Sequence, residues 1–286
     1  MLQILPDDLS LWLRWLFSYS FLMIRYLLFA GGVYLFYYII KRREWFVAKI
    51  QQKYPERKQI ITEIKYSLLT FAVFASISVL IRYLSAQGIL EVKTYRDFSE
   101  HSIGYFIATT IFIIFFHDTY FYWIHRLMHH PFFYERVHKV HHLSKNPTPW
   151  AAFSFHPLEA VLELAFIPIL VFTIPLHISS LIILAFWQIV FNVMGHSGYE
   201  IFPRNAKNTV IKWLNSSTNH NMHHKYVRCN YGLYFNIWDR LMKTNHPKYF
   251  ETFEEVTARR DAVFSQAKGE KHDEPTPEIA MGSNSI

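Results

Sequence analysis

Three short clusters of histidine stand out among the 16 histidines of this sequence. The first is the pair His125 and His129, and the other two repeat one pattern, H-x-x-H-H. These two triplets are His138, His141 and His142, and then His220, His223 and His224. Imidazole is the commonest metal ligand among side chains. The three clusters together therefore predict a polynuclear metal centre instead of a single structural ion.

A helical backbone would gather the members of each cluster. Positions i, i+3 and i+4 lie on one face of a helix, so each H-x-x-H-H predicts a set of ligands on one face. His117 precedes His125 by eight residues, an angular offset of roughly 80°. We therefore predict that His117 shares the ligand sector of His125 and His129. His130 is rotated one residue further and is predicted to point away.

The remaining histidines are isolated and are weighed singly. His196 ends a long apolar stretch within Gly195-His196-Ser197-Gly198, and we predict that it is also a ligand. His156, in Phe155-His156-Pro157, is either a ligand or a partner of one. For an isolated pair such as His125 and His129, the alternative is two histidines packed at a membrane interface. The repetition of the pattern in three clusters is what favours metal.

The choice of metal follows from the available ligands. Cys229 is the only cysteine, so thiolate-bound zinc and iron–sulfur sites are excluded within one chain. Nitrogen-rich sites favour iron, copper, zinc or nickel. A mononuclear zinc hydrolase needs about three protein ligands, whereas this chain offers more than are needed for one metal. Two haems would use only four axial histidines and leave the adjacent pairs without a role. Two metals, with iron suited to O₂ chemistry, are the prediction.

The composition places these histidines in a membrane protein. Hydrophobic residues make up 51% of the chain and aromatic residues 18%. Spans of roughly 20 apolar residues cross a bilayer, and we predict spans at 17–40, 66–81 and 103–116. Residues 164–195 are too short for two crossings and contain Pro168 and Pro175, so they predict a bent hairpin. The net charge of +7 is expected from basic loops at an anionic membrane surface, and nucleic-acid binding is not expected.

The predicted topology brings the clusters to one face. The linker between residues 41 and 58 is strongly basic, which predicts a cytoplasmic location. A helix that starts at residue 103 and continues to Pro131 would deliver the first cluster to that face, and the hairpin would return His156 and His196 there. The fold class is an all-α integral membrane bundle of about four membrane-embedded segments with a cytosolic helical cap. We divide it into N-terminal membrane helices (1–102), a catalytic domain (103–262) and a disordered tail (263–286).

The clusters also occur in a characteristic order with other motifs. His117-Asp118, Phe155-His156-Pro157-Leu158-Glu159, Gly195-His196-Ser197-Gly198-Tyr199, Asn230-Tyr231-Gly232 and Trp238-Asp239-Arg240 accompany the three histidine clusters. From about His117 to Thr244 the chain resembles the fatty acid hydroxylase superfamily of membrane di-iron oxygenases. That superfamily includes sterol desaturases and C4-methylsterol oxidases. One departure is Lys243, where the family often has glycine, and it argues against a close match to any one subfamily.

The resemblance implies specific roles for these residues. It implies a helical membrane enzyme whose metal ligands are His117, His125, His129, His138, His141, His142, His196, His220, His223 and His224. Ligating imidazoles usually donate their other N–H to an acceptor. The candidates for that supporting role, or for ordinary capping and loop hydrogen bonds, are Asp118, His156, Glu159, Asn230 and Asp239.

The expected activity is the hydroxylation or desaturation of a lipid, such as a fatty acyl chain or a sterol. The expected cofactors are two iron ions, which zinc can replace in purified protein, with O₂ as co-substrate. No fused cytochrome b5-like domain is seen, so electrons are expected from a separate donor of the cytochrome b5-like or ferredoxin type. The main alternative is a membrane metal transporter lined by histidines. A second alternative is a lipid-binding relative without catalytic activity.

Overall fold

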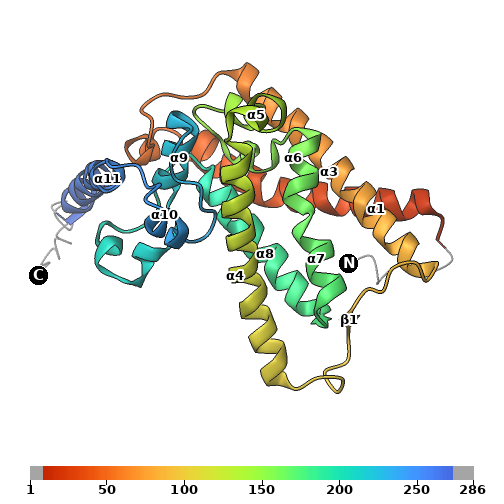
Figure 1. Ribbon diagram of the computed structural model, residues 1–286. Helices are drawn as coiled ribbons and strands as arrows, with labels where there is room; N and C mark the ends of the chain where they lie inside the picture. The colour runs from red at the N-terminus through yellow and green to blue at the C-terminus, as the bar shows by residue number, and fades with distance from the viewer. Residues whose placement is uncertain (1–8, 273–286) are drawn as a thin grey trace, which may run out of the picture.

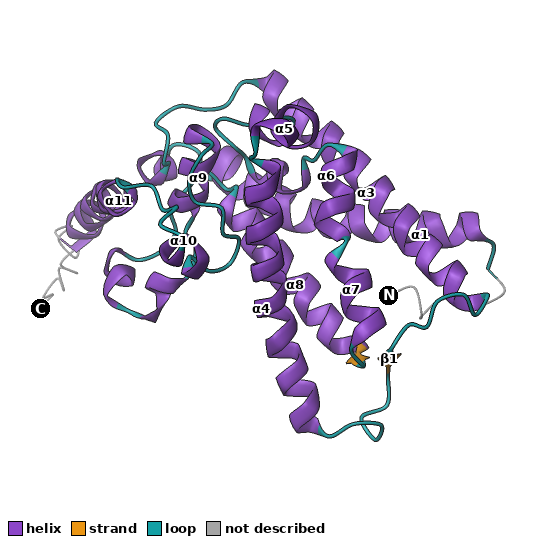
Figure 2. Ribbon diagram, viewed as in Figure 1, coloured by secondary structure: helices purple, strands orange, loops and turns teal. Residues whose placement is uncertain are grey.

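The structure is a computed structural model that describes residues 9–272. It is almost entirely helical (Figures 1 and 2). The α-helices are α1 (Leu11–Tyr26), α2 (Gly32–Tyr34), α3 (Arg57–Ala86), α4 (Ile103–Met128), α5 (Pro131–Phe133), α6 (Pro157–Leu164), α7 (Phe166–Thr173), α8 (Ile178–Gly195), α9 (Ser217–Tyr226), α10 (Ile237–Leu241) and α11 (Tyr249–His272). Among the described residues, the strands are β1 (Thr94–Tyr95) and β2 (Leu176–His177), which pair in parallel.

Short π- and 3₁₀-helical turns connect or extend these helices. The π-helical turns are η2 (Leu27–Gly31), η3 (Leu35–Ile40) and η5 (Tyr134–His138). The 3₁₀ turns are η4 (Glu44–Ala48), η6 (His141–Leu143), η7 (Pro149–Phe153), η8 (Arg204–Asn208) and η9 (Val210–Trp213). Because η2, α2 and η3 follow α1 without a break, residues 11–40 form one continuous helical segment.

Four helical segments in the described part of the chain are long and apolar enough to cross a bilayer. They are Leu11–Ile40, Arg57–Ala86, Ile103–Met128 and Ile178–Gly195. Large apolar side chains such as Leu28, Ile111 and Phe186 are exposed on them, which costs free energy in water but not against lipid. The chain is therefore a multi-pass membrane protein, as the sequence predicts.

The fourth spanning segment belongs to the bent hairpin predicted from the sequence. Its first arm is α6 and α7, and its second arm is α8. The turn falls at Pro175, directly before the pairing of β2 with β1. At eight residues, α7 is too short to cross the bilayer, so the chain enters beside α4 and returns through α8.

Two apolar cores fix the helices around the histidines. One packs α1 and α3 against η7 and α8 through Tyr26, Phe71 and Ile189. The other packs α4 against α7 and α8, with Ile113 and Phe166 at its centre. In Figure 1, α9, α10 and α11 lie on one side of α4, and α1, α3, α6 and α7 lie on the other. The histidine clusters occupy the junction between these two halves.

The C-terminal tail differs from the prediction in part. We expected residues 263–286 to be disordered, but α11 continues to His272. The reason is local, because the residues from 263 onward include good helix formers such as alanine, glutamine, glutamate and lysine, which can extend a helix already packed at its start. Phe253 and Val256 in the first half of α11 are buried. The rest of that prediction, residues 273–286, lies outside the described residues.

Candidate metal centre

Nine of the ten histidines predicted as ligands gather into two buried groups. The five-histidine group consists of His125, His129, His138, His142 and His223, and the four-histidine group consists of His141, His196, His220 and His224. Within each group the candidate ligand nitrogens all lie within 4.8 Å of one another. The two groups adjoin, since the rings of His141 and His224 contact that of His142, with centroids 5.7 Å and 5.1 Å away.

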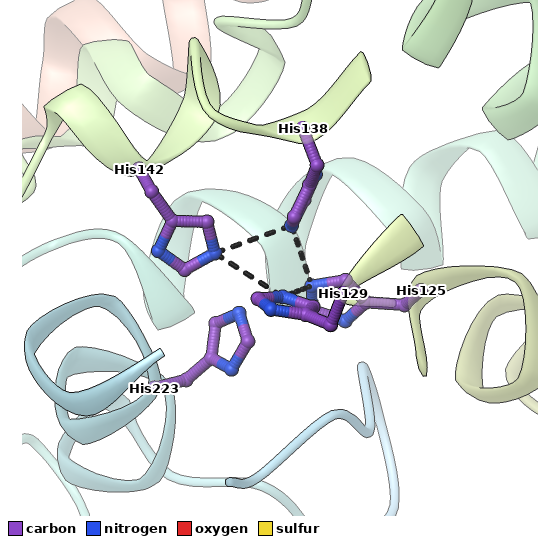
Figure 3. Close-up of side chains that lie close together, drawn as sticks. All are labelled: His125, His129, His138, His142 and His223. Carbon is purple, nitrogen blue, oxygen red and sulfur yellow. Dashed lines mark hydrogen bonds between the residues drawn. The ribbon is translucent and has the colours of Figure 1, made fainter. Parts of the chain in front are cut away.

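The five-histidine group converges on its Nε2 atoms. Nε2 of His125 lies 3.0 Å from Nε2 of His138 and 3.3 Å from that of His129. Nε2 of His142 lies 3.3 Å from His129 and 3.2 Å from His138. Figure 3 shows His223 approaching the other four rings from the opposite side to His138 and His142. The five rings thus surround one point.

The four-histidine group also converges on its Nε2 atoms. Nε2 of His196 lies 3.3 Å from Nε2 of His141 and 2.9 Å from that of His220. Nε2 of His224 lies 3.2 Å from that of His220. All four rings are buried. This group therefore also presents its nitrogen atoms towards a common point.

Helical periodicity explains why two histidines four residues apart belong to the same group. The tertiary structure places the middle histidine of each triplet in the other group. Each pair four residues apart serves one group, as His220 and His224 do on α9. The middle histidine of each triplet, His141 or His223, serves the other group. Adjacent residues on a helix diverge by about 100°, so His223 and His224 can face two centres at once. The prediction of one ligand face for each triplet is too simple.

The segments that carry the histidines are locally stabilised. The hydroxyl of Ser216 caps α9 by accepting from the amide of Asn219, which satisfies a free donor at the helix start. Val227 ends α9 with a φ of 69°. His138 and His141 lie in separate π- and 3₁₀-helical turns, although the spacing predicts one helix there.

The chemistry of these imidazoles fits metal ions. Burial, with the neighbouring imidazoles, lowers the pKa of His138, His142 and His220 well below the usual 6.5. Burial likewise lowers the pKa of His196 to about 4. The rings are therefore neutral near pH 7 and keep a lone pair for a metal. Nε2 of His223 is buried and has no hydrogen-bond partner within residues 9–272, as expected of an atom that awaits a metal.

The spacing of the nitrogens is also right for coordination. With metal–nitrogen bonds of about 2.0–2.1 Å, adjacent ligands lie about 3 Å apart and opposite ligands about 4.2 Å apart. The closest Nε2 separations in the two groups run from 2.9 Å to 3.3 Å, within the overall limit of 4.8 Å. Each group can therefore hold one metal ion through its histidines.

Several histidines of the two groups have acceptors that orient their second ring nitrogen. Nδ1 of His138 lies 2.7 Å from the Glu159 carboxylate. Nδ1 of His125 lies 2.8 Å from the Tyr231 carbonyl, and Nδ1 of His223 lies 2.6 Å from the Cys229 carbonyl. In the four-histidine group, Nδ1 of His196 lies 2.7 Å from the Asn192 carbonyl. Such acceptors fix the tautomer with Nε2 free to bind metal.

Sequence reasoning missed the carbonyl acceptors, because every residue has one and residue type carries no signal for it. The carbonyl of Tyr231 is nevertheless held in place by Asp239, one of the supporting residues predicted from the sequence. The Asp239 carboxylate accepts from the amides of Tyr231 and Gly232 at 2.9 Å and 2.8 Å. A Cβ at Gly232 would lie 2.5 Å from the Phe235 carbonyl, so only glycine fits this turn. Asp239 therefore supports His125 through the backbone.

Two further candidates hold loops and do not contact a ligand. The Asp118 carboxylate accepts from the amides of Tyr234 and Phe235 at 2.7 Å and 3.2 Å. Asn230 bridges two segments, donating to the Asn219 carbonyl and accepting from the amide of His246. Both side chains brace the segment that follows the third cluster.

The structure brings neither His117 nor His156 into a histidine group. Nδ1 of His117 lies 2.7 Å from the Tyr234 hydroxyl, and its ring stacks on Phe166 at 3.9 Å between centroids. His156 caps α6 by accepting from the amide of Leu158. A ligand role for His117 stays a prediction; its Nε2 is buried and has no hydrogen-bond partner within residues 9–272.

Comparison with known proteins gives this site a family. Residues 110–244 match the fatty acid hydroxylase family. Human lathosterol oxidase is 31% identical over 231 residues, which covers 77% of this chain and 74% of that protein. The chain belongs to the fatty acid hydroxylase family.

Fungal members of the fatty acid hydroxylase family are similar to this chain to the same degree. Delta(7)-sterol 5(6)-desaturase erg3C of Aspergillus fumigatus is 30% identical, over 80% of this chain and 77% of that protein. Delta(7)-sterol 5(6)-desaturase of Leptosphaeria maculans is 31% identical, over 90% of this chain and 67% of that protein. No solved structure matches. The family match at 110–244 contains all nine histidines of both groups.

Proposed function

We propose that this chain is a membrane-bound oxidoreductase that uses two irons, O₂ and external electrons to desaturate a sterol. The observation that carries the proposal is the pair of adjoining histidine groups at the ends of α4 and α8. The named relatives, a lathosterol oxidase and Delta(7)-sterol 5(6)-desaturases, support a sterol within the wider class of lipids. Hydroxylation of a lipid is the alternative reaction that the same chemistry allows.

Desaturation has a defined balance. One C–H bond on each of two neighbouring carbons breaks and a double bond forms, while O₂, two electrons and two protons complete the formation of two water molecules. When bound, the two irons would supply the activation of O₂ for this reaction. The electrons come from a separate donor protein, which we expect to be of the cytochrome b5-like or ferredoxin type.

The protein's own side chains would bind the metals and shield them from bulk water. Nine neutral imidazoles would hold the metals, with the acceptors on Glu159, Tyr231, Cys229 and Asn192 setting the direction of individual rings. All nine rings are buried, so bulk water is kept from the centre. Such exclusion protects a reactive centre from side reactions.

The arrangement favours an enzyme over a metal transporter. In a transport path, polar ligands are spaced along the interior of the spans and are joined by carboxylates. Here both groups are compact and consist of histidine alone. A transporter must also release its ion, whereas four or five imidazoles around one point favour retention.

The orientation in the membrane is part of the proposal. The segment after Ile40 carries Lys41, Arg42 and Arg43, and positive loops favour the cytoplasmic side. Lys49 in this segment is fully buried, and its Nζ lies 3.3 Å from the Asn146 side chain. Asn146 follows His142 by four residues, so the basic segment and the metal centre share one face. We infer that the centre faces the cytoplasm.

Lipid mass spectrometry of cells that express the chain tests the proposal. We expect a sterol that has lost two hydrogens, and its amount should depend on O₂ and on intact His138 and His224. A sterol or other lipid that gains one oxygen would redirect the proposal to hydroxylation. Metal flux into proteoliposomes without any O₂ consumption would overturn it in favour of transport. Iron must be supplied during expression, since zinc can occupy the same imidazoles.

A further inference from the structure

An apolar cavity of about 570 Å³ lies between α1, α3, α6, α7 and α8. Its volume falls within the range of about 300–1,000 Å³ that is typical of small-molecule sites. Aromatic and aliphatic side chains such as Phe21, Phe74, Leu184 and Phe186 line it. No histidine of either metal group belongs to the lining. The cavity is therefore a separate feature within the membrane part of the molecule.

The order of residues along each helix shows which end of the cavity faces the metals. α8 ends beside its ligand His196, and α6 begins beside Glu159, which contacts the ligand His138. The helical segment that begins with α1 leads to Tyr38, whose hydroxyl donates to the Ser197 carbonyl next to His196. The metal centre thus lies towards the C-terminal ends of α1 and α8 and the N-terminal end of α6.

On each of these three helices, the lining residue nearest the metal centre is polar. It is Arg25 on α1, Glu163 on α6 and Gln188 on α8. We call these three side chains the polar rim. Deeper in the cavity the wall is apolar except for Ser18 and Ser78. The cavity therefore has a polar end towards the metals and an apolar end away from them.

The polar rim lacks hydrogen-bond partners of its own within the part of the chain that the structure describes. Nε of Arg25 is buried without a hydrogen-bond partner in the described part of the chain. Glu163 is 6% exposed, and among residues 9–272 its carboxyl group accepts no hydrogen bond and forms no ion pair. Burying polar groups without hydrogen-bond partners costs free energy, and ionisable groups within a membrane usually mark a functional site. The polar rim is best explained by a ligand that supplies the missing contacts.

The polar rim lies close to the metal centre. Glu163 is four residues from Glu159, which corresponds to about 6 Å along a helix axis, and Gln188 is eight residues from His196, or about 12 Å. Phe166 also lines the cavity, and its ring stacks on His117 of α4 at 3.9 Å between centroids. Phe166 thus forms part of the wall on the side of α4, with His117 packed behind it.

We propose that this cavity binds the lipid substrate, with the hydroxyl end at the polar rim and the apolar body between α1, α3, α7 and α8. The inference rests on the proposed function and extends it to the way in which the substrate is held. The rim offers hydrogen-bond donors on Arg25 and Gln188 and acceptors on Glu163 and Gln188, so a group that both donates and accepts, such as a hydroxyl, fits it better than a carboxylate, which only accepts. A hydroxyl group can accept from Arg25 or Gln188 and can donate to Glu163 or Gln188.

This orientation has a chemical consequence. Because the polar rim is the end of the cavity nearest the metals, the carbons close to the hydroxyl group lie nearest the site of oxidation. A lipid whose reactive carbons are far from its polar end would have to bind in the opposite direction and bury that end in the apolar part. Arg25, Glu163 and Gln188 are therefore positioning residues that set which carbons react.

Photo-crosslinking tests the site independently of turnover. The probe is a Δ7-sterol with a free 3-hydroxyl and a side-chain diazirine, added to purified protein in phosphatidylcholine nanodiscs. We expect crosslinks to α1, α3, α7 or α8, and competition by the unlabelled sterol but roughly tenfold weaker competition by its 3-methyl ether. Ala185→Phe, which fills the cavity, should abolish the crosslinks. Crosslinks confined to the outer surface of the bundle would overturn the proposal.

Kinetics with variants of the polar rim provide the second test. Arg25→Met and Glu163→Gln should raise KM for the sterol roughly tenfold with a smaller change in kcat, and should reduce the preference for the free hydroxyl over the methyl ether. Lys65→Met and Glu135→Gln, which remove exposed charges outside the cavity, are the matched controls. Metal content and a single elution peak show whether each variant is folded. Unchanged KM and unchanged preference in both rim variants would overturn the role of the polar rim.

The two proposals fail in different ways. Crosslinks in the cavity without any sterol oxidation would contradict the proposed function and leave the binding site in place. Sterol oxidation that is unaffected by Ala185→Phe would contradict the cavity and leave the function in place. A free fatty acid that competes better than the sterol would overturn the choice of a neutral polar end.

Discussion

The two histidine groups come from the same segments of chain but are not equivalent. α9 and the segment from His138 to His142 contribute to both. The five-histidine group has one more imidazole and also a carboxylate, Glu159, against His138. The acceptors found in the four-histidine group are backbone carbonyls, such as that of Asn192 against His196.

The difference suggests a division of work between two metals. A six-coordinate metal would keep one position free in the five-histidine group and two in the four-histidine group. A carboxylate partner raises the basicity of its imidazole and strengthens metal binding. We therefore expect the five-histidine group to hold its metal more tightly, and the four-histidine group to be more open to ligands that the protein does not supply.

Removing one histidine from either group should have the largest effect on turnover. We expect His223→Ala and His220→Ala, both on α9, to lower turnover more than ~100-fold, since even partners of ligands are worth 10–100-fold. Each variant should lose metal chiefly from its own group, measured by metal analysis and by O₂ consumption with product formation. O₂-dependent turnover retained in both variants would contradict the ligand assignment.

Replacing the carboxylate partner of His138 should weaken metal binding in the five-histidine group and leave the four-histidine group unchanged. We expect Glu159→Gln to weaken metal binding in the five-histidine group by about 10–100-fold, because a neutral amide stabilises the metal-bound imidazole less. Chelator titration followed by metal analysis measures this. Glu135→Gln, which removes an exposed carboxylate, is the control. Equal loss of both metals in Glu159→Gln would mean that the two groups are coupled and not separate.

A smaller effect is expected from the loop that holds the Tyr231 carbonyl. Asp239→Asn removes a charged acceptor from two backbone amides and the Thr244 hydroxyl, which should lower the free energy of unfolding by about 1.5–3 kcal/mol. The five-histidine group should weaken more than the four-histidine group, because His125 depends on Tyr231. Thermal unfolding with and without metal measures both effects. An equal weakening of the two groups would show that the loop supports the whole centre.

The smallest effect concerns Lys49, whose Nζ lies close to Gly198, two residues after His196. Burial lowers the pKa of Lys49 from 10.5 to about 7, although Glu63 opposes this. Between pH 7 and 10.5 the unfolded chain binds a proton at this lysine that the folded chain does not, so stability should rise with pH in this window. We expect Tm to increase from pH 7 to pH 9 more in the native protein than in Lys49→Met. Parallel pH profiles would show that Lys49 stays charged when buried.

Much of the membrane architecture follows from the sequence, because hydropathy is a local property. The spans at 17–40, 66–81 and 103–116 lie within observed helices, and the hairpin bends at Pro175 as predicted. The helix ends are less well predicted. α3 begins at Arg57, nine residues before the expected span, because a helix can extend beyond the bilayer where its first turns pack on other parts of the protein.

The sequence by itself determined which side chains are candidate metal ligands, since residue type and spacing suffice to define i, i+4 pairs such as His220 and His224. Only the tertiary structure decided how the ligands divide between two centres. His141 and His223 leave their own clusters for the opposite group, and His117 falls outside both. The physical reason is that spacing fixes directions relative to one helix axis. Which centre a ring reaches depends on how separate helices pack, and that packing is set by contacts between residues far apart in the chain.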